Sequence, residues 1–271
     1  MNSLPLGRVM LVVAHPDDES GAASLILQRA QDSMVVFCTD GAPADPWFWS
    51  QYGTRKAYAG VRRSEAVEAL ATIGVKCVSF LTSSNPDEFH DQALHKALPS
   101  AIDLVARLAR WYEPEVIVTS AYEGGHPDHD SCSFIAFSVG ASSQIPVWEI
   151  PLYHRPPSGE LVYQAFADPN GSEIRLVPKQ NETAAKSGML RQYRSQRDLQ
   201  LFASAPVEYV RPQKAYDYSQ PPSHVINYEV WRWHIRAVDL CTAFSQVPQT
   251  LELSSRPTVF NAATTVVATT P

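Results

Sequence analysis

The sequence predicts an α/β fold: a Rossmann-like, mostly parallel sheet with helices on both faces. Two continuous apolar runs, at residues 9–13 and 34–38, are typical of strands that are covered on both faces. Segments with helical spacing of apolar residues separate such runs, and this alternation predicts a parallel sheet with right-handed crossovers. The carboxyl ends of the strands then meet at one edge, where open α/β sheets bind their ligands.

Strands and helices alternate through the first half of the chain. Four strands are expected, at residues 9–13, 34–38, 77–81 and 116–119. Four helices are expected, at residues 21–30, 56–73, 91–111 and 131–139. The second helix ends at Gly74, because glycine readily takes the left-handed conformation of a C-terminal cap. The third ends before Pro114, because proline cannot continue a helix.

The pattern changes after residue 145. The later elements are expected in this order: a strand at 147–150, a hairpin of strands 161–166 and 174–177 around the turn 168–172, a helix at 183–197, and a Pro- and Tyr-rich loop at 205–223. The whole chain, 1–271, is expected to be one domain. It has a core at 8–200, a small carboxy-terminal extension at 201–253 and a frayed Thr- and Ala-rich tail at 254–271.

Composition excludes some classes of function. The chain has 271 residues with a net charge of -6, which argues against non-specific nucleic-acid binding, since such binding needs a basic surface. No apolar run is long enough to span a membrane, and the first residues lack the pattern of a secretory signal. The four cysteines form no CxxC pair, so reduced thiols and a cytoplasmic location are expected. A homo-oligomer is possible.

Two short motifs follow predicted strands and carry the chemistry. Residues 14–19 read Ala-His-Pro-Asp-Asp-Glu, and residues 125–130 read Gly-His-Pro-Asp-His-Asp. His15, Asp18 and His129 would supply two nitrogens and one oxygen, a known catalytic zinc set that leaves a fourth position for water. Another divalent metal would also suit these ligands. Taken singly, either motif has a plainer explanation, such as an aspartate that caps a helix.

The two motifs resemble those of the LmbE-like, or PIG-L, family of zinc-dependent N-acetylglucosaminyl deacetylases. The resemblance extends over residues 8–200 and includes Thr39-Asp40-Gly41, Arg62-x-x-Glu65 and Ser195-Gln196. It implies a Rossmann-like fold and hydrolysis of an N-acyl group on an amino sugar or a similar compound. The chain departs from family members that deacetylate a thiol precursor, which have a tyrosine where this chain has Gly124. This departure argues against that particular substrate.

Three residues beside the ligands are expected to carry the reaction, and the resemblance implies the same roles. Asp17 would accept the proton of a metal-activated water as general base. His126 would stabilise the oxyanion and, when protonated, pass a proton to the departing amine. Asp128 would orient His126 and raise its pKa. A simple loop hydrogen bond is the alternative for Asp128.

Four further residues are candidates for substrate binding, and three of them have a structural alternative. Arg62 would grip a hydroxyl or acid group, or else pair with Glu65 on its own helix. Asp87 would contact sugar hydroxyls, or else serve as a turn residue. Trp47, in the aromatic loop 41–55, would stack on a sugar ring, or else be buried by its own loop. Tyr122 leads into the second motif. For Trp231 and Trp233 core packing is expected.

The expected function is that of a zinc-dependent hydrolase, an amidohydrolase that removes an N-acetyl or other N-acyl group from an amino sugar. Its partner would be a small N-acylated amino sugar or glycoconjugate, without nucleic acid or membrane. Two alternatives stay open. One is a non-catalytic, zinc-containing carbohydrate-binding protein, although such a protein needs neither Asp17 nor His126. The other is a metal-dependent phosphoesterase, although such sites usually bridge two metals with more carboxylates.

Overall fold

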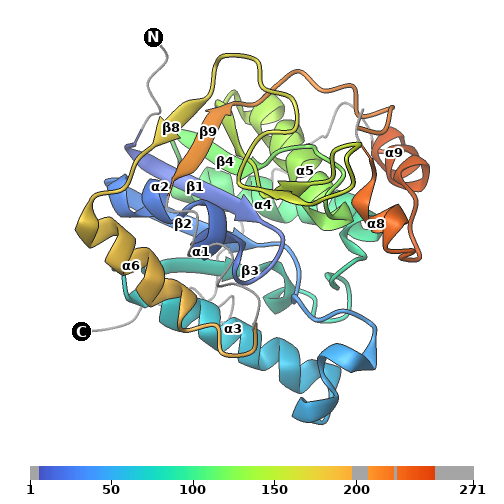
Figure 1. Ribbon diagram of the computed structural model, residues 1–271, viewed down its shortest axis with the longest axis horizontal. Coiled ribbons are helices and arrows are strands. Elements are labelled where there is room, and N and C mark those ends of the chain that lie inside the picture. Colours follow the sequence, from blue (N-terminus) through green and yellow to red (C-terminus); the bar gives the residue numbers. More distant parts are fainter. Residues whose placement is uncertain (1–5, 197–206, 223–224, 248–271) are drawn as a thin grey trace.

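The computed structural model describes residues 6–196, 207–222 and 225–247, and its helices and strands alternate through the first half of the chain (Figure 1). The first elements are β1 (Arg8–Val13), α1 (Asp18–Ala22), α2 (Ser24–Arg29), β2 (Asp32–Phe37), α3 (Arg55–Ala71), β3 (Cys77–Phe80), α4 (Leu98–Tyr112), β4 (Val116–Ser120) and α5 (Pro127–Ser143). The later elements are β5 (Val147–Ile150), β6 (Tyr153–His154), β7 (Val162–Tyr163), β8 (Ile174–Leu176), α6 (Gln180–Leu190), β9 (Glu208–Pro212), α8 (Asn227–Val230) and α9 (Ala237–Ser245).

Seven strands form the main sheet, in the order β3-β2-β1-β4-β5-β9-β8. The first five strands are parallel, while β9 is antiparallel to both of its neighbours. The predicted α/β class with a mostly parallel sheet is therefore confirmed. The chain order reverses between β1 and β4, and such a switch point is where open α/β sheets bind ligands. The first motif directly follows β1, and the second follows β4 after residues 121–124.

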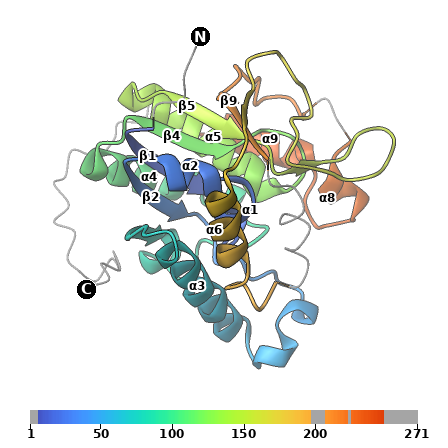
Figure 2. The same ribbon diagram turned by 60° about the vertical axis from the view of Figure 1, so that its left-hand side comes forward.

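Helices cover both faces of the sheet (Figures 1 and 2). Along β1, Met10 and Val12 face the side of α4, α5 and α9, whereas Leu11 and Val13 face the side of α2, α3 and α6. All four side chains are fully buried. A strand that is apolar on both faces needs such a layer on each side, which is why a continuous apolar run predicted this architecture.

The prediction of a hairpin around residues 168–172 is wrong. The turn itself is local, because Glu173 accepts hydrogen bonds from the backbone N–H groups of Asn170 and Gly171. The flanking segments, however, pair with other partners: β7 with β6, and β8 with β9. Strand β9 lies within the segment 205–223 that was expected to be a loop. Buried Arg211 of β9 forms an ion pair with Glu149 of β5, 2.7 Å away, a contact too distant in sequence to predict.

Several helix boundaries also differ from the prediction. The helix expected at 21–30 is broken at Ala23 into α1 and α2. The helix expected from residue 91 begins at Leu98, with a single 3₁₀ turn (Leu94–Ala97) before it. The helix expected at 131–139 begins at Pro127, so the second motif forms its first turn. The helix expected at 183–197 ends at Leu190, and residue 197 lies outside the described residues.

The predicted division of the carboxy-terminal region remains a prediction. The boundary near residue 200 falls within 197–206, and the whole expected tail falls within 248–271, both outside the described residues. Within the described ranges, no helix has the length and apolar character needed to cross a membrane.

Candidate metal centre and active site

The first motif forms a tight turn at the end of β1. Asp17 has a positive φ of 127°, a conformation that non-glycine residues avoid and that is found mostly at functional sites. The turn is held by two hydrogen bonds, from the His15 N–H to Asp18 Oδ2 (2.8 Å) and from the Asp17 N–H to Glu19 Oε2 (2.9 Å). The turn therefore brings the side chains of His15 and Asp18 together.

The second motif begins α5 after β4. The imidazole of His126 caps this helix, because its Nδ1 accepts the N–H of Asp128 (3.1 Å). The Ser120 hydroxyl donates to the His129 carbonyl oxygen (2.9 Å), which ties the first turn of the helix to the end of the strand. The carboxylate of Asp130 accepts hydrogen bonds from the backbone N–H groups of residues 123 and 124, and so holds the loop between β4 and α5.

The three predicted ligands lie together at the switch point. Nε2 of His129 is 3.2 Å from Asp18 Oδ1, and Nδ1 of His15 is 3.6 Å from Asp18 Oδ2. Burial alone would raise the pKa of Asp18, but the two imidazoles hold it well below its usual value. In the described structure, His129 Nε2 is buried and has no well-aligned hydrogen-bond partner. Two nitrogens and a carboxylate in this arrangement fit a divalent cation such as zinc.

A second group of possible ligands overlaps the first. His15, Asp91, His126 and Asp128 are all buried, and one ligand atom from each lies within 4.8 Å of the others. Asp91 Oδ1 is 3.3 Å from His15 Nε2 and 3.5 Å from His126 Nε2. It is buried without a hydrogen-bond partner among the described residues. His15, His126 and His129 form another such group. The geometry therefore offers several overlapping sets of ligands, and the set predicted from the sequence stays a prediction.

Asp91 is a site residue that the sequence analysis missed. Asp87, the residue predicted from the sequence, lies in the same loop but is exposed, and its N–H donates locally to Asn85 Oδ1 (3.3 Å). Asp91 instead turns inward, where its N–H donates to Asp40 Oδ1 (3.1 Å). The one signal in the sequence was an aspartate shortly after a predicted strand, and both residues share that signal.

Asp128 lies against a different histidine from the one expected. Its Oδ2 is 3.3 Å from His15 Nε2 but 4.0 Å from His126 Nδ1, which already accepts the backbone N–H of Asp128. Carboxylates that hold the outer nitrogen of a ligating histidine orient that ligand. Burial and the two neighbouring imidazoles keep the pKa of His126 well below its usual value, whereas the expected role required it to be raised.

Asp17 faces the cavity and is held by Arg62. The Arg62 guanidinium donates to Asp17 Oδ2 (2.7 Å) and also to the carbonyl oxygens of Gly41 and Pro16. Burial raises the pKa of Asp17 to about 7, against the opposing effect of Arg62. Arg62 is itself buried, and Glu65, its expected alternative partner, instead accepts from Ser195. The hydrogen bonds of Arg62 are therefore those of a residue that positions Asp17.

The candidate site opens into a cavity of about 450 Å³. Its lining joins the motif residues to aromatic side chains from other parts of the chain: His15, Asp17, Asp18, Pro43, Phe48, Tyr58, Arg62, Asp91, Gln92, His126, His129, Leu152, Tyr153, Gln196, Trp231 and Trp233. Trp47 is not in this lining. It is 78% exposed and packs edge-on against Phe48, which takes the place in the cavity that was expected of Trp47.

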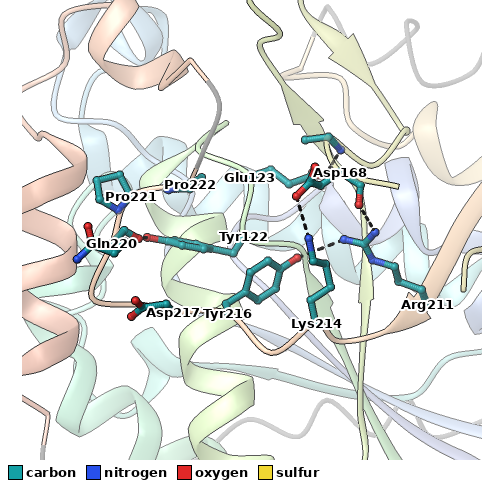
Figure 3. Close-up of a pocket in the computed structure, with 11 residues that line it drawn as sticks. Tyr122, Glu123, Asp168, Arg211, Lys214, Tyr216, Asp217, Gln220, Pro221 and Pro222 are labelled. Carbon is teal, nitrogen blue, oxygen red and sulfur yellow. Dashed lines mark hydrogen bonds and ion pairs between the residues drawn. The ribbon is translucent and has the colours of Figure 1, made fainter. Parts of the chain in front are cut away.

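Tyr122 lines a different, smaller cavity of about 180 Å³ (Figure 3). Its hydroxyl donates to the carbonyl of Gln220 (2.9 Å), and its ring packs against Tyr216 and Tyr218. In the same cavity, Lys214 forms an ion pair with Asp168 at 2.9 Å. The tyrosine therefore anchors the segment that precedes α8, and the substrate contact expected of it has no support in its position.

Glu123, beside Tyr122, leads to a prediction about stability and pH. Its carboxyl is buried, and burial raises its pKa from 4.5 to about 8. The folded state therefore binds the proton more tightly than the unfolded state does. The stabilisation is complete below pH 4.5 and is lost as the pH rises through about 8. Glutamine copies the protonated form of this side chain. As the pH rises from 4.5 to about 8, we therefore expect the free energy of unfolding of Glu123→Gln to fall less than that of the unsubstituted protein.

Urea unfolding at about pH 5 and about pH 8 measures this difference. The exposed Glu160→Gln is the matched control and should follow the unsubstituted protein at both values. If the free energy of unfolding of Glu123→Gln kept a constant offset from the unsubstituted protein, the assigned pKa shift would be wrong.

Comparisons with known proteins agree with this geometry. The family model described as PIG-L, GlcNAc-PI de-N-acetylase, matches residues 10–139. A 1D-myo-inositol 2-acetamido-2-deoxy-alpha-D-glucopyranoside deacetylase from Mycobacterium sp. (strain KMS) is 27% identical over 168 residues, which cover 54% of this chain and 53% of that protein. A mycothiol S-conjugate amidase from Streptomyces coelicolor is 31% identical over 157 residues, 51% of this chain and 54% of that protein. The chain spans about half the length of these curated relatives.

Solved structures show the same fold. A deacetylase triple mutant involved in teicoplanin biosynthesis superimposes with a TM-score of 0.61 at 20% identity, over 76% of this chain and 97% of that one. At this identity the likeness supports the fold alone. The matched segment 10–139 contains both motifs and all six residues that they contribute to the site. Residues 10–139 therefore match the PIG-L, or LmbE-like, deacetylase family.

Proposed function

We propose that this chain is a metal-dependent amidohydrolase that removes an N-acyl group, first of all acetyl, from an amino sugar or an amino-sugar conjugate. The observation that carries the proposal is the convergence of Asp17 with His15, Asp18 and His129 in one cavity of about 450 Å³. The names of the matched relatives, a deacetylase and an amidase, support the same class of reaction.

His15, Asp18 and His129 would hold the metal, and zinc suits this set of donors best. The bound metal supplies a Lewis acid and lowers the pKa of water. Asp128 holds His15 in orientation from the far side of its ring. A bound cation would offset the negative charge of the Asp18 carboxylate within this buried cluster.

Asp17 takes the proton from the attacking water. Its pKa of about 7 suits a general base near neutral pH, and Arg62 keeps its carboxylate aimed into the cavity. After the water has added to the amide carbonyl, the departing amine needs a proton. Asp17 carries that proton and can return it.

His126 supplies a hydrogen-bond donor to the oxyanion in this scheme. Its Nδ1 accepts a backbone N–H, so in the neutral ring the proton lies on Nε2, which is 3.5 Å from Asp91 Oδ1. A fixed donor at the position of developing charge is a large contributor to catalysis of acyl transfer. This role replaces the protonated His126 that was expected, because burial and the neighbouring histidines lower its pKa.

The remaining predictions concern partners and location. We propose a small N-acylated amino sugar or glycoconjugate as the substrate. Cys38, Cys77, Cys132 and Cys241 are all free thiols in the structure, as a cytoplasmic protein would have. A homo-oligomer remains a prediction without a surface assigned to it.

Amine release from a panel of N-acetylated sugars and conjugates tests the proposal. We expect zinc-loaded protein to release amine, and we expect release to stop with a chelator and to return when metal is added back. Binding without hydrolysis, unchanged by the chelator, would instead favour a carbohydrate-binding protein. Release of inorganic phosphate from sugar phosphates would favour a phosphoesterase.

A further inference from the structure

Two tryptophans from the far end of the chain form part of the wall of the candidate active site. Trp231 and Trp233 follow α8 and line the same cavity as the motif residues. The ring of Trp233 meets His126 edge-on, 4.9 Å between centroids, and Trp231 lies 5.2 Å from Trp233. Core packing was expected for both. Trp233 packs partly against the core, but Trp231 is 42% exposed.

The segment that carries these rings is docked on the second motif. Asn227 donates from its backbone N–H to the Gly124 carbonyl (2.8 Å) and from its side chain to the Gly125 carbonyl (3.1 Å). Arg155 Nε donates to Oδ1 of the same Asn227 side chain (2.9 Å). The position of the two tryptophans is therefore set by the loop that leads to His126.

The two residues that accept these hydrogen bonds are glycines in close contact with their surroundings. Gly124 has a φ of +67°, and a Cβ there would lie 2.8 Å from Ile226 Cδ1. A Cβ on Gly125 would lie 2.0 Å from the Tyr153 carbonyl oxygen. A side chain at position 124 would be strained at this φ and would displace the tip of Ile226, whereas one at position 125 would collide with the backbone of β6. The chain thus has no side chain at position 124 and instead brings aromatic rings to the cavity from the segment docked there.

The cavity has two chemically different parts. The ligands and Asp17 provide its charged part, whereas Phe48, Tyr58, Tyr153, Trp231 and Trp233 provide rings. Beyond the motifs, the polar side chains of the lining are Tyr58, Arg62, Asp91, Gln92, Tyr153 and Gln196. Three of them are already engaged, because the Arg62 guanidinium is bound to Asp17 and Gln196 Nε2 donates to the Tyr58 hydroxyl (2.6 Å). A second sugar ring would need many hydrogen-bond partners there. A flat aromatic ring needs few, and it gains from stacking on the indoles.

We propose that Trp231 and Trp233 bind an aromatic ring attached to the amino sugar, so that the preferred substrates are aryl conjugates. The inference rests on the proposed function, because it places the N-acyl group at the metal centre and the ring against the indoles. The cavity volume of about 450 Å³ lies within the range of sites for drug-sized ligands. Trp231 is the specificity residue to test, because Trp233 also touches His126.

The first experiment compares kcat/KM for the p-nitrophenyl and methyl glycosides of N-acetylglucosamine. The zinc-loaded protein should prefer the aryl glycoside by about 2- to 10-fold, the range of an aromatic stacking contact. In Trp231→Ala the ratio should fall towards one. Trp111→Ala is the matched control, because Trp111 is 50% exposed on α4 and is absent from the cavity lining, and it should keep the ratio. Thermal melts verify that both variants fold.

The second experiment measures binding without turnover. Titration calorimetry of the zinc-loaded Asp17→Asn variant should give a lower Kd for the aryl glycoside than for the methyl glycoside, and adding Trp231→Ala should remove the difference. If no N-acyl compound is hydrolysed but this binding difference holds, the proposed reaction fails and the aromatic site stands. Equal Kd values, an unchanged ratio in Trp231→Ala, or a stronger preference for N,N'-diacetylchitobiose would overturn the aromatic site.

Discussion

Asp17→Asn is expected to lower kcat by about a hundredfold to ten-thousandfold, the usual contribution of a general base. Asparagine keeps the shape of the side chain and can still accept a hydrogen bond from Arg62, which now donates to Asp17 Oδ2 at 2.7 Å. What it loses is the ability to take a proton. The pKa of Asp17, about 7, places that ability in the working pH range.

The measurement must separate loss of the base from loss of the metal. Zinc content is therefore determined on the same preparation by elemental analysis and should match that of the unsubstituted protein. Asp103→Asn is the matched control, because this aspartate pairs with Arg107 on α4 and is absent from the cavity lining. Full metal-dependent turnover by Asp17→Asn would show that another group is the base.

The second large effect concerns the metal itself. Asp18→Asn should lose most of its zinc on dialysis, whereas Asp91→Asn should retain it. Asp18 lies between His129 and His15, at 3.2 and 3.6 Å, and its carboxylate completes the predicted set of ligands. Asp91 contacts the outer nitrogen of His15 and belongs to the overlapping group. Loss of such an outer partner typically weakens metal affinity by about 10- to 100-fold, less than the loss of a ligand.

Metal content after dialysis against a series of free zinc concentrations gives both affinities. A chelator should also lower the melting temperature of the unsubstituted protein, because a bound metal stabilises the folded state by mass action. The same chelator should leave the melting temperature of Asp18→Asn nearly unchanged. If Asp91→Asn lost its zinc while Asp18→Asn kept it, the metal would be held by His15, Asp91, His126 and Asp128 instead.

Local patterns in the sequence were enough to predict the fold class and the metal motifs. The runs at 9–13 and 34–38 are apolar on both faces, so they could be stable only inside a covered sheet. His15 and Asp18 lie in one turn, and His126 and His129 lie in the first turn of one helix. Neighbours this close in the chain meet whatever the rest of the protein does. Parallel pairing of β1 with β4 then brings the two motifs to one edge.

Tertiary structure alone decided which of several similar residues reach the site. Asp87 and Asp91 share a loop, yet only Asp91 turns towards His15. Trp47 and Phe48 share a single 3₁₀ turn (Pro46–Phe48), yet only Phe48 faces the cavity. The choice depends on packing partners that are distant in sequence, and no local pattern carries that information.

The places of Trp231 and Trp233 in the cavity could likewise not be predicted from a local pattern in the sequence. Trp231 lies more than a hundred residues beyond Gly125, and its place in the cavity depends on the hydrogen bonds of Asn227 to residues 124 and 125. The sequence by itself determined the α/β class and the closeness of the residues within each motif, because strand burial and motif spacing act locally. Only the tertiary structure decided the partners of Asp128 and Arg62 and the shape of the substrate cavity, because those depend on contacts between separate segments.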